Sequence, residues 1–335
     1  MAFASQPHTV LVTAPKLAPA GAELLAQSGA RVLYLPALGT AEDVARILAR
    51  EPVDAVISRT VDLTASAIGS CSTLKVISKH GVGVSNIDVA AATARGIPVY
   101  MTPGANAQSV AELTLGLLFA VARRLSWMDA EIKAGRWSRT QDGLELSGRR
   151  LGLVGFGQVG QRVARVCQAL GMIVHAHDPA LRGGASPVAG VQCWEDLDAM
   201  LAQSDVLSLH VPLNPHTRGL INAERLALLP RGAILINTAR GEVVDEAALI
   251  GALSAGRLRG AGLDTMTVEP LPADSPLLAL PNVVLTPHVG GSTPAALDAM
   301  AAGAARNVLG WLQGRPADSG ACVNPQVLAT PSHPL

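Results

Sequence analysis

Three glycines in the segment LGLVGFGQVGQRVARV have the spacing of a phosphate-binding turn. Gly155, Gly157 and Gly160 form G-x-G-x-x-G between an apolar run and a helical stretch. Such glycines let the chain turn tightly, let a pyrophosphate approach the backbone, and let the helix pack closely on the strand. Gln158 and Val159 would present the amides nearest the phosphates. In this strand-to-helix context, the motif favours a dinucleotide site over an ordinary glycine-rich turn.

An acid follows these glycines at the end of the next apolar run, MIVHAHD. Asp178 stands about 20 residues past the motif, where a carboxylate binds the ribose hydroxyls and repels a 2'-phosphate. This position favours NAD over NADP, although Arg182 nearby argues in the other direction. Taken alone, an aspartate before Pro179 would be interpreted as a turn residue.

Three residues with acid–base or anion-binding chemistry follow later apolar runs. Arg240 follows AILIN, Glu269 follows AGLD, and His288 follows VVLT. A lone histidine at a strand end is more often structural than catalytic. Ligands of open parallel sheets, however, bind beyond the carboxyl ends of the strands. We therefore expect the loops that carry these residues to converge on the edge that binds the cofactor phosphates.

Short β-branched runs alternate with alanine-rich helical stretches and must position these residues. A first set of runs, TVLVT, RVLYL, DAVIS and LKVIS, precedes a long apolar helix, and the pattern restarts at LGLVG. This alternation predicts two α/β units with parallel sheets and crossover helices. The helical stretch PAALDAMAAGAARNVLGWL is long enough to return to the first unit, and the tail after Gly314 is expected to be unstructured.

Composition limits the class of protein and its partners. A chain of 335 residues with 49% hydrophobic residues predicts two domains with sizeable cores. Basic and acidic residues number 26 each and form no basic tract, which argues against nucleic acid and membrane partners. The four scattered cysteines argue against a zinc site or a disulfide framework. With no signal-peptide pattern and no apolar stretch of roughly 20 residues, we expect a cytoplasmic, metal-free protein.

A series of ordered motifs resembles the D-isomer-specific 2-hydroxyacid dehydrogenase family over nearly the whole chain. The motifs are SKHGVGVSNIDVAAATARGIPV, GFGQVG, NTARGEVVDEAAL, LDTMTVEP and LTPHVGG. The resemblance implies an NAD-dependent oxidoreductase acting on the CH–OH group of its donor. It implies two Rossmann-like, doubly wound domains: a discontinuous flavodoxin-like substrate domain (residues 1–103 and 292–330) and an inserted NAD-binding domain (residues 104–291). It also implies a homodimer formed by the long helices around the inserted domain.

The same resemblance assigns roles to individual residues. Arg240 would bind the substrate carboxylate and polarise the carbonyl, His288 would deliver the proton, and Glu269 would orient the imidazole. Further cofactor contacts are implied at Val82, Val211, Thr238, Ala239, Asp264, Gly290 and Gly291. Substrate contacts are implied at Lys79, Gly81, Val82, Gly83 and Arg240.

The substrate itself stays open at this point. We predict a small 2-oxo acid/D-2-hydroxy acid pair of the hydroxypyruvate or glyoxylate type, with D-3-phosphoglycerate as the alternative. Ile57 stands, by our alignment, where many phosphoglycerate dehydrogenases have arginine, whereas Lys79 matches a second basic position. An NAD(H)-sensing, corepressor-like binding protein is the alternative of another class. Formate dehydrogenases are disfavoured because they place Gln beside the histidine, where this chain has Glu269.

Overall fold

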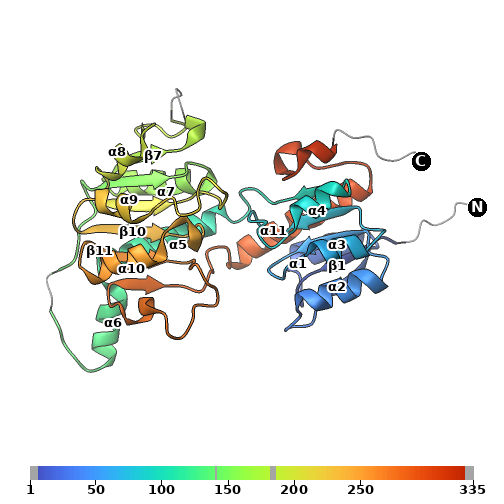
Figure 1. Ribbon diagram of the computed structural model, residues 1–335, viewed down its shortest axis with the longest axis horizontal. Helices are drawn as coiled ribbons and strands as arrows, with labels where there is room; N and C mark the ends of the chain where they lie inside the picture. The colour runs from blue at the N-terminus through green and yellow to red at the C-terminus, as the bar shows by residue number, and fades with distance from the viewer. Residues whose placement is uncertain (1–6, 140–141, 182–185, 329–335) are drawn as a thin grey trace, which may run out of the picture. The chain divides into compact units, whose positions relative to one another are not determined.

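The computed structural model describes residues 7–139, 142–181 and 186–328. Arg182, which argues against a strict NAD preference, lies outside these residues. The chain divides into two compact units: Met1–Asn106 with Thr293–Leu335, and Ala107–Ser292. Each unit is built on a twisted parallel sheet with helices on its faces (Figure 1). The prediction of two doubly wound, parallel-sheet α/β domains is confirmed.

The first unit has a five-stranded sheet in the order β2-β1-β3-β4-β5, the flavodoxin-like order. Its strands are β1 (Thr9–Val12), β2 (Arg31–Tyr34), β3 (Ala55–Ser58), β4 (Val76–Lys79) and β5 (Val99–Tyr100). Its helices are α1 (Pro19–Gln27), α2 (Ala41–Arg50), α3 (Ala65–Ser70), α4 (Val89–Ala94) and α11 (Pro294–Leu312). The central strands are apolar and buried on both faces, as expected for a parallel sheet covered by crossover helices.

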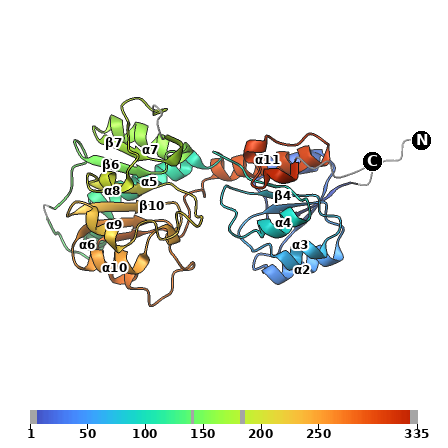
Figure 2. The ribbon, with the colours of Figure 1, turned by 45° about the horizontal axis from the view of Figure 1, so that its top comes forward.

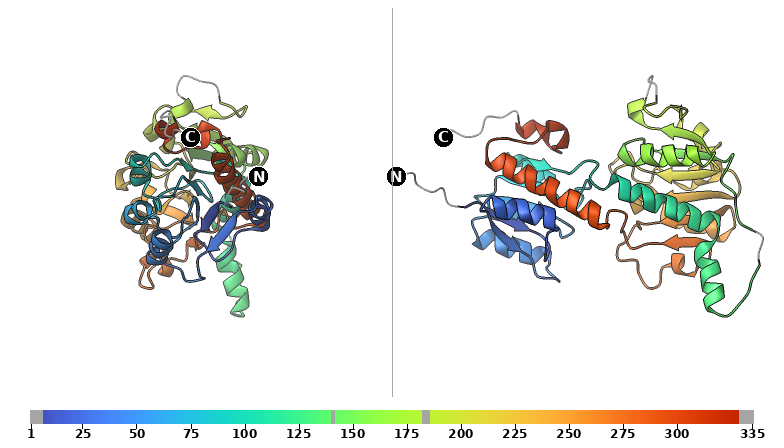
Figure 3. Two further views of the ribbon diagram at one scale, coloured as in Figure 1. Left: turned by 90° about the vertical axis from the view of Figure 1, so that its right-hand side faces the viewer. Right: turned by 180° about the vertical axis from the view of Figure 1, so that it is seen from behind.

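Two helix layers enclose this sheet. Helices α2, α3 and α4 cover one face, and α11 lies on the other (Figure 2). Side chains of α2, α3 and α4 complete the core on the first face, and those of α1 and α11 complete it on the second. The helices α1 and α11 lie side by side (Figure 3, right). A Cβ atom at Gly21 would lie 2.7 Å from the Cβ of Ala301, so this crossing requires glycine. The last long helix therefore packs on the first unit, although the second unit separates the two in sequence.

The segment after Gly314 is ordered up to Leu328, so the prediction of an unstructured tail was wrong there. Tyr100 and Cys322 form an antiparallel bridge along the outer side of β5. The Asn324 side chain accepts a hydrogen bond from the Val99 amide at 2.8 Å and donates one to the Ile97 carbonyl at 3.0 Å. An edge strand has unpaired backbone groups, and the tail satisfies them. The composition of the tail cannot reveal such a partner.

The second unit has a seven-stranded parallel sheet in the order β12-β11-β10-β9-β6-β7-β8. Its strands are β6 (Arg150–Val154), β7 (Ile173–His177), β8 (Gln192–Cys193), β9 (Val206–Leu209), β10 (Ala233–Asn237), β11 (Leu258–Leu263) and β12 (Val283–Leu285). This is the Rossmann order, 3-2-1-4-5-6, extended by one strand. The order reverses at β6, so the Gly155 loop lies at the switch point where dinucleotides bind.

Helices cover both faces of the second sheet. They are α5 (Ala107–Ala122), α6 (Leu125–Lys133), α7 (Gln158–Ala169), α8 (Leu197–Leu201), α9 (Ala223–Leu228) and α10 (Glu246–Ser254). Side chains of α5 and α7 pack on one face, and those of α8, α9 and α10 pack on the other. Helix α6 differs because none of its residues is buried.

Candidate active site

The turn between β6 and α7 has the shape that a dinucleotide needs. Gly155 has φ +93°, and a Cβ there would lie 2.5 Å from the carbonyl oxygen of His210. A Cβ on Gly160 would lie 2.4 Å from the Gly155 carbonyl oxygen. A Cβ on Gly157, by contrast, would meet nothing within 4 Å, and this residue precedes α7 without a side-chain cap. Two glycines are required by packing, and the third leaves an exposed helix N-terminus that suits a pyrophosphate.

Asp178 follows β7 and is tied to the same turn. One carboxylate oxygen accepts the Phe156 amide at 2.8 Å, and the other accepts the Ala180 amide at 2.9 Å. Each oxygen retains a second lone pair, and the side chain is only partly buried. The residue can therefore accept ribose hydroxyls while it holds the glycine turn in place. The residues of this loop fit NAD.

The other residues implied for the cofactor separate into two groups. Val211 and Thr238 follow β9 and β10 of the second unit, and Ala239 is fixed by a 3.0 Å bond from its amide to the Asn237 side chain. A Cβ on Gly155 would touch Val211, so this valine lies at the glycine turn. Val82 belongs to the first unit, where its side chain is 42% exposed.

Asp264, at the end of β11, is buried and bound to the loop that carries the histidine. Its Oδ1 accepts the Thr286 hydroxyl at 2.6 Å and the Val289 amide at 2.9 Å, and its Oδ2 accepts the Gly290 amide at 2.8 Å. Gly290 is held from its other side, because the Ser109 hydroxyl donates to its carbonyl at 2.5 Å. Asp264 therefore fixes the loop from Thr286 to Gly290, and Gly291 follows at its end.

Within the second unit, the structure brings Glu269 and His288 together. The Oε2 atom of Glu269 lies 2.8 Å from Nδ1 of His288, and its Oε1 accepts the Met266 amide at 3.0 Å. His288 has φ +53°, and its amide donates to the Asp264 carbonyl at 2.8 Å. A carboxylate anchored at one oxygen thus orients the imidazole through Nδ1. The Nε2 atom is left as the ring nitrogen that can exchange a proton with a substrate.

Arg240 follows β10 and carries its charge in a partly buried place. Its Nη1 donates to the Ala239 carbonyl at 2.6 Å, and the Asn237 amide group donates to the Arg240 carbonyl at 2.8 Å. Burial lowers the pKa of the guanidinium, while the charges of Glu269 and Glu242 act in the opposite direction. Arg240 and Glu269 therefore lie within electrostatic reach of each other, and a partly desolvated guanidinium binds carboxylates strongly.

The residues implied for the substrate lie in the first unit, after β4. The Lys79 ammonium donates to the Arg59 carbonyl and to the Asn86 side chain. The Gly81 amide donates to the Thr102 hydroxyl at 3.0 Å. In the described part of the chain, the amides of Val82 and Gly83 have no hydrogen-bond acceptor. Lys79 and the Gly81 amide thus serve the loop's own structure, and the next two amides can meet a ligand.

The residues that hold the site in shape were not predicted from the sequence. Asn237, Ser109 and Thr286 carry no chemistry of their own, but they fix the Arg240 and His288 loops. For Asn237, the only feature that could have indicated its role was its place as a polar residue at the end of an apolar strand. Ser109 is of a residue type common at helix starts, and nothing near it in the sequence indicates that it contacts Gly290.

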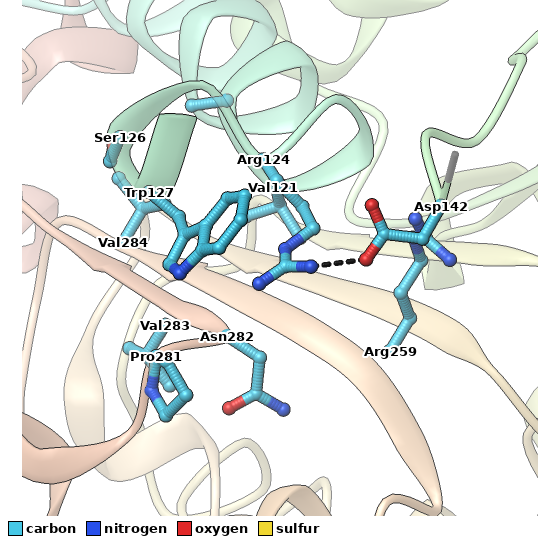
Figure 4. Close-up of a pocket in the computed structure, with 11 residues that line it drawn as sticks. Val121, Arg124, Ser126, Trp127, Asp142, Arg259, Pro281, Asn282, Val283 and Val284 are labelled. Atoms are coloured by element: carbon cyan, nitrogen blue, oxygen red, sulfur yellow. Dashed lines mark hydrogen bonds and ion pairs between the residues drawn. The ribbon is translucent and has the colours of Figure 1, made fainter. Parts of the chain in front are cut away.

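A cavity of about 240 Å³ in the second unit lies at the other end of its strands (Figure 4). Arg259 and Val283, which line it, stand near the amino ends of β11 and β12, whereas the residues above follow carboxyl ends. The Arg124 guanidinium lies 4.1 Å from the Trp127 ring centre and pairs with Asp142. This cavity is therefore separate from the candidate active site.

Two further observations concern metals and membranes. Among the residues that the structure describes, no group of three or more His, Cys, Asp or Glu side chains could hold a metal ion. No described helix has the length and apolar character needed to cross a membrane.

Comparison with known proteins identifies the family. Residues 115–290 match the model of the D-isomer specific 2-hydroxyacid dehydrogenase NAD-binding domain. The chain is 45% identical to hydroxypyruvate reductase of Thermotoga maritima, covering 72% of this chain and 79% of that protein. It is 42% identical to D-3-phosphoglycerate dehydrogenase of Methanocaldococcus jannaschii over 79% of this chain, and it spans 50% of that relative's length.

A solved structure agrees with these matches over the length of both chains. The structure of a glyoxylate reductase from Paecilomyes thermophila superposes with a TM-score of 0.85 at 30% identity, covering 96% of this chain and 99% of that one. The resemblance inferred from the sequence motifs is thus confirmed. The chain belongs to the D-isomer specific 2-hydroxyacid dehydrogenase family, and its second unit is the family's NAD-binding domain.

Proposed function

We propose that the chain is an NAD-dependent D-2-hydroxyacid dehydrogenase that interconverts a small 2-oxo acid and its D-2-hydroxy acid, of the hydroxypyruvate or glyoxylate type. The observation that carries the proposal is the 2.8 Å contact between Glu269 Oε2 and His288 Nδ1. A histidine oriented by a carboxylate is suited to proton transfer near neutral pH.

The chemistry divides between the cofactor and three side chains. NADH, when bound, supplies the hydride. Arg240 binds the substrate carboxylate through its planar guanidinium and draws electron density from the adjacent carbonyl. His288 gives the Nε2 proton to the carbonyl oxygen as reduction proceeds and takes it back in the reverse direction. Glu269 stabilises the imidazolium and fixes the ring orientation through Nδ1.

In the first unit, we propose that the loop after β4 contacts the substrate. The open amides of Val82 and Gly83 support this role, because backbone N–H groups bind carboxylates without adding charge. Val82 would also contact the cofactor. We assign Lys79 to supporting this loop, since its ammonium is engaged by Arg59 and Asn86.

The test is oxidation of NADH with a panel of 2-oxo acids: hydroxypyruvate, glyoxylate and phosphohydroxypyruvate. We expect hydroxypyruvate or glyoxylate to give the highest kcat/KM. A kcat/KM at least tenfold higher for phosphohydroxypyruvate, roughly 1.4 kcal/mol of transition-state discrimination, would assign the protein to phosphoglycerate oxidation instead. Absence of turnover with every 2-oxo acid, with NADH still bound, would favour the sensor function.

Phosphoglycerate dehydrogenase is the second candidate because relatives with that name match this chain at 42% identity. The side chains of the first unit support it less well. Ile57 stands where many phosphoglycerate dehydrogenases have arginine, but it is fully buried within β3. This side chain therefore brings no charge and contacts no ligand. The substrate test above separates the two candidates.

We also propose a homodimer, formed by the face that α5 and α6 present. Large apolar side chains are exposed on Phe119 (37%) of α5, on Leu125 (50%) and Ile132 (53%) of α6, and on Trp137 (75%), which follows α6. A helix such as α6, with no buried residue, gains little stability within its own chain. Apolar surface of this kind marks a protein interface. The four cysteines of the described chain are free, which supports a reducing, cytoplasmic location for that dimer.

Light scattering after size exclusion measures the mass of the assembly. We expect twice the chain mass for the natural protein and a shift towards the monomer for Ile132→Ser combined with Trp137→Ser. The exposed Leu38 of the first unit, at 92% exposure, provides the matched control through Leu38→Ser. A monomer at all concentrations would contradict the dimer.

A further inference from the structure

The loop that carries Arg240 touches the loop that carries Glu269, backbone against backbone. Gly241 directly follows the arginine, is buried, and begins a short 3₁₀ helix. A Cβ atom on Gly241 would lie 2.0 Å from the carbonyl carbon of Met266, 2.2 Å from its oxygen and 2.4 Å from the Thr267 nitrogen. The φ angle of Gly241 is not in the left-handed region. Glycine is therefore required here by space and not by backbone conformation.

Met266 connects this contact to the acid–base pair. Its amide donates to Glu269 Oε1 at 3.0 Å, and Glu269 Oε2 lies 2.8 Å from Nδ1 of His288. Gly241 thus packs on the residue that anchors the carboxylate, and that carboxylate orients the imidazole. All of these residues belong to the second unit. The position of Arg240 relative to His288 is set through this short series of contacts.

Both loops are also held from their outer sides, so neither can withdraw freely. The Asn237 side chain donates to the Arg240 carbonyl at 2.8 Å, and the Thr267 amide donates to the Glu246 carboxylate at 2.9 Å. The atoms that a methyl group on Gly241 would meet are backbone atoms, which cannot turn aside as a flexible side chain does. Since a Cβ atom needs at least 3.0 Å there and would have 2.0 Å, the two backbones would have to separate by about 1 Å.

This separation matters for the proposed chemistry. A 2-oxo acid has its carbonyl carbon bonded directly to its carboxylate carbon. Arg240 must therefore bind the carboxylate at a distance from His288 that matches this short spacing. We propose that Gly241 is a positioning residue: through its contact with Met266 it sets that distance and selects acids whose reacting oxygen lies on the carbon next to the carboxylate. The role rests on the proposed function, because it requires Arg240 and His288 to contact one ligand.

The experiment measures the binding of oxalate and malonate to the full chain saturated with NADH, by the change in NADH fluorescence. Oxalate has two adjacent carboxylates and reproduces the spacing of a 2-oxo acid, whereas malonate has one more carbon between them. We expect the natural protein to prefer oxalate. Gly241→Ala should lower kcat/KM for hydroxypyruvate and glyoxylate by about 100-fold, the loss that a 1 Å misplacement causes. It should also weaken oxalate binding by about tenfold and reduce the preference over malonate.

Gly251→Ala provides the matched control. This glycine lies on the exposed side of α10, where an added Cβ would meet nothing within 4 Å, so both affinities and kcat/KM should be unchanged. The NADH affinity of Gly241→Ala should stay within about threefold of the natural value, because Asp178 and the glycine turn are untouched. If Gly241→Ala does not fold, Asn237→Asp replaces it. That variant puts an oxygen in place of the NH₂ group that donates to the Arg240 carbonyl, so it displaces the same loop without added volume and should lose the same preference.

An oxalate-to-malonate preference that is equal in the displaced-loop variant and in Gly251→Ala would overturn the role of Gly241. Equal proportional losses for oxalate, malonate and NADH would overturn it as well, since they indicate general damage. In both cases turnover of 2-oxo acids by the natural protein leaves the proposed function standing. A natural protein that turns over no 2-oxo acid refutes the proposed function, and oxalate binding then tests the spacing without turnover. Absence of both turnover and oxalate binding would refute the two together.

Discussion

The loops at the carboxyl ends of the two sheets satisfy their polar side chains differently. At the carboxyl edge of the second sheet, the acid–base pair has internal partners: Glu269 holds His288, and Asp264 holds the loop that carries it. At the corresponding edge of the first sheet, the Arg59 guanidinium and the amides of Val82 and Gly83 have no partner in the described chain. Groups that perform chemistry are fixed in advance, whereas groups that bind are left for the ligand to satisfy.

The largest effect should come from removing the group that transfers the proton. We expect His288→Ala to lower kcat by about 100-fold to 10,000-fold, the range typical of general acid–base catalysis. NADH affinity should stay within about twofold, because the glycine turn and Asp178 are untouched. His216→Ala removes an exposed histidine from the same unit and serves as the control. A His288 variant with near-natural kcat would refute its role.

The next largest effect should come from weakening the bonds by which Asp264 holds the loop from Thr286 to Gly290. Asp264→Asn replaces one acceptor oxygen by an NH₂ group, which then faces the backbone donor of either Val289 or Gly290. We expect the free energy of unfolding of the second unit to fall by about 3 kcal/mol, since a buried donor without a partner costs about 1–3 kcal/mol and charge-assisted bonds are lost. We also expect kcat to fall. Denaturation and steady-state kinetics measure the two effects, with the exposed Asp274→Asn as the control. A stable Asp264 variant with lowered NADH affinity alone would assign the residue to the cofactor instead.

A third prediction concerns the buried His80 of the first unit and how the free energy of unfolding depends on pH. Burial, followed by the charge of Arg59, lowers the pKa of His80 from 6.5 to about 4. Between these values the unfolded chain binds the proton that the folded chain excludes, so acidification through this window destabilises the fold. From pH 7 to pH 5 the loss is about 2 kcal/mol for this residue. In denaturant titrations, His80→Asn should lose less stability over the same interval than the natural protein does. Equal losses would show that His80 is charged in the folded state.

The smallest effect concerns cofactor choice. Asp178→Ala should lower the ratio of kcat/KM for NADH to that for NADPH by about tenfold, because ribose hydrogen bonds and the repulsion of a 2'-phosphate are both removed. The residue also holds the Phe156 amide, so Asp178→Asn, which keeps one acceptor, separates charge from loop geometry. An unchanged ratio in both variants would assign the discrimination to another group.

Local pattern predicted most of the fold and the chemistry of the second unit. The runs that form β1 to β4 and β6 match the observed strands because buried parallel strands are almost continuously apolar. Gly155 and Gly160 could be interpreted from spacing because their roles depend on the turn itself. The two-residue strands β5 and β8 are too short to show any period, and hydrogen-bonded neighbours define them.

The sequence could not predict which distant group forms a hydrogen bond with a given polar side chain. Lys79 and Arg59 are both basic residues near a strand end, and the sequence gives no reason to distinguish them. The difference arises because Asn86 accepts a hydrogen bond from the Lys79 ammonium, whereas none of the described residues that line a cavity beside Arg59 is acidic. Similarly, Ser109 meets Gly290 although 181 positions separate them in sequence. Such pairings depend on the packing of whole elements, which residue type alone does not determine.

Because α11 packs closely against α1 but is synthesised last, the two units complete their folding at different times during translation. The ribosome releases all of the second unit before α11 appears, so that unit can fold while the first still lacks the helix that covers β3 and β4. During that interval an apolar sheet face is exposed to solvent and to chaperones. A premature stop before Pro294 should therefore yield a chain that still binds NADH but aggregates through its amino-terminal half. Pulse proteolysis of stalled nascent chains would reveal the moment at which the last helix closes the first domain.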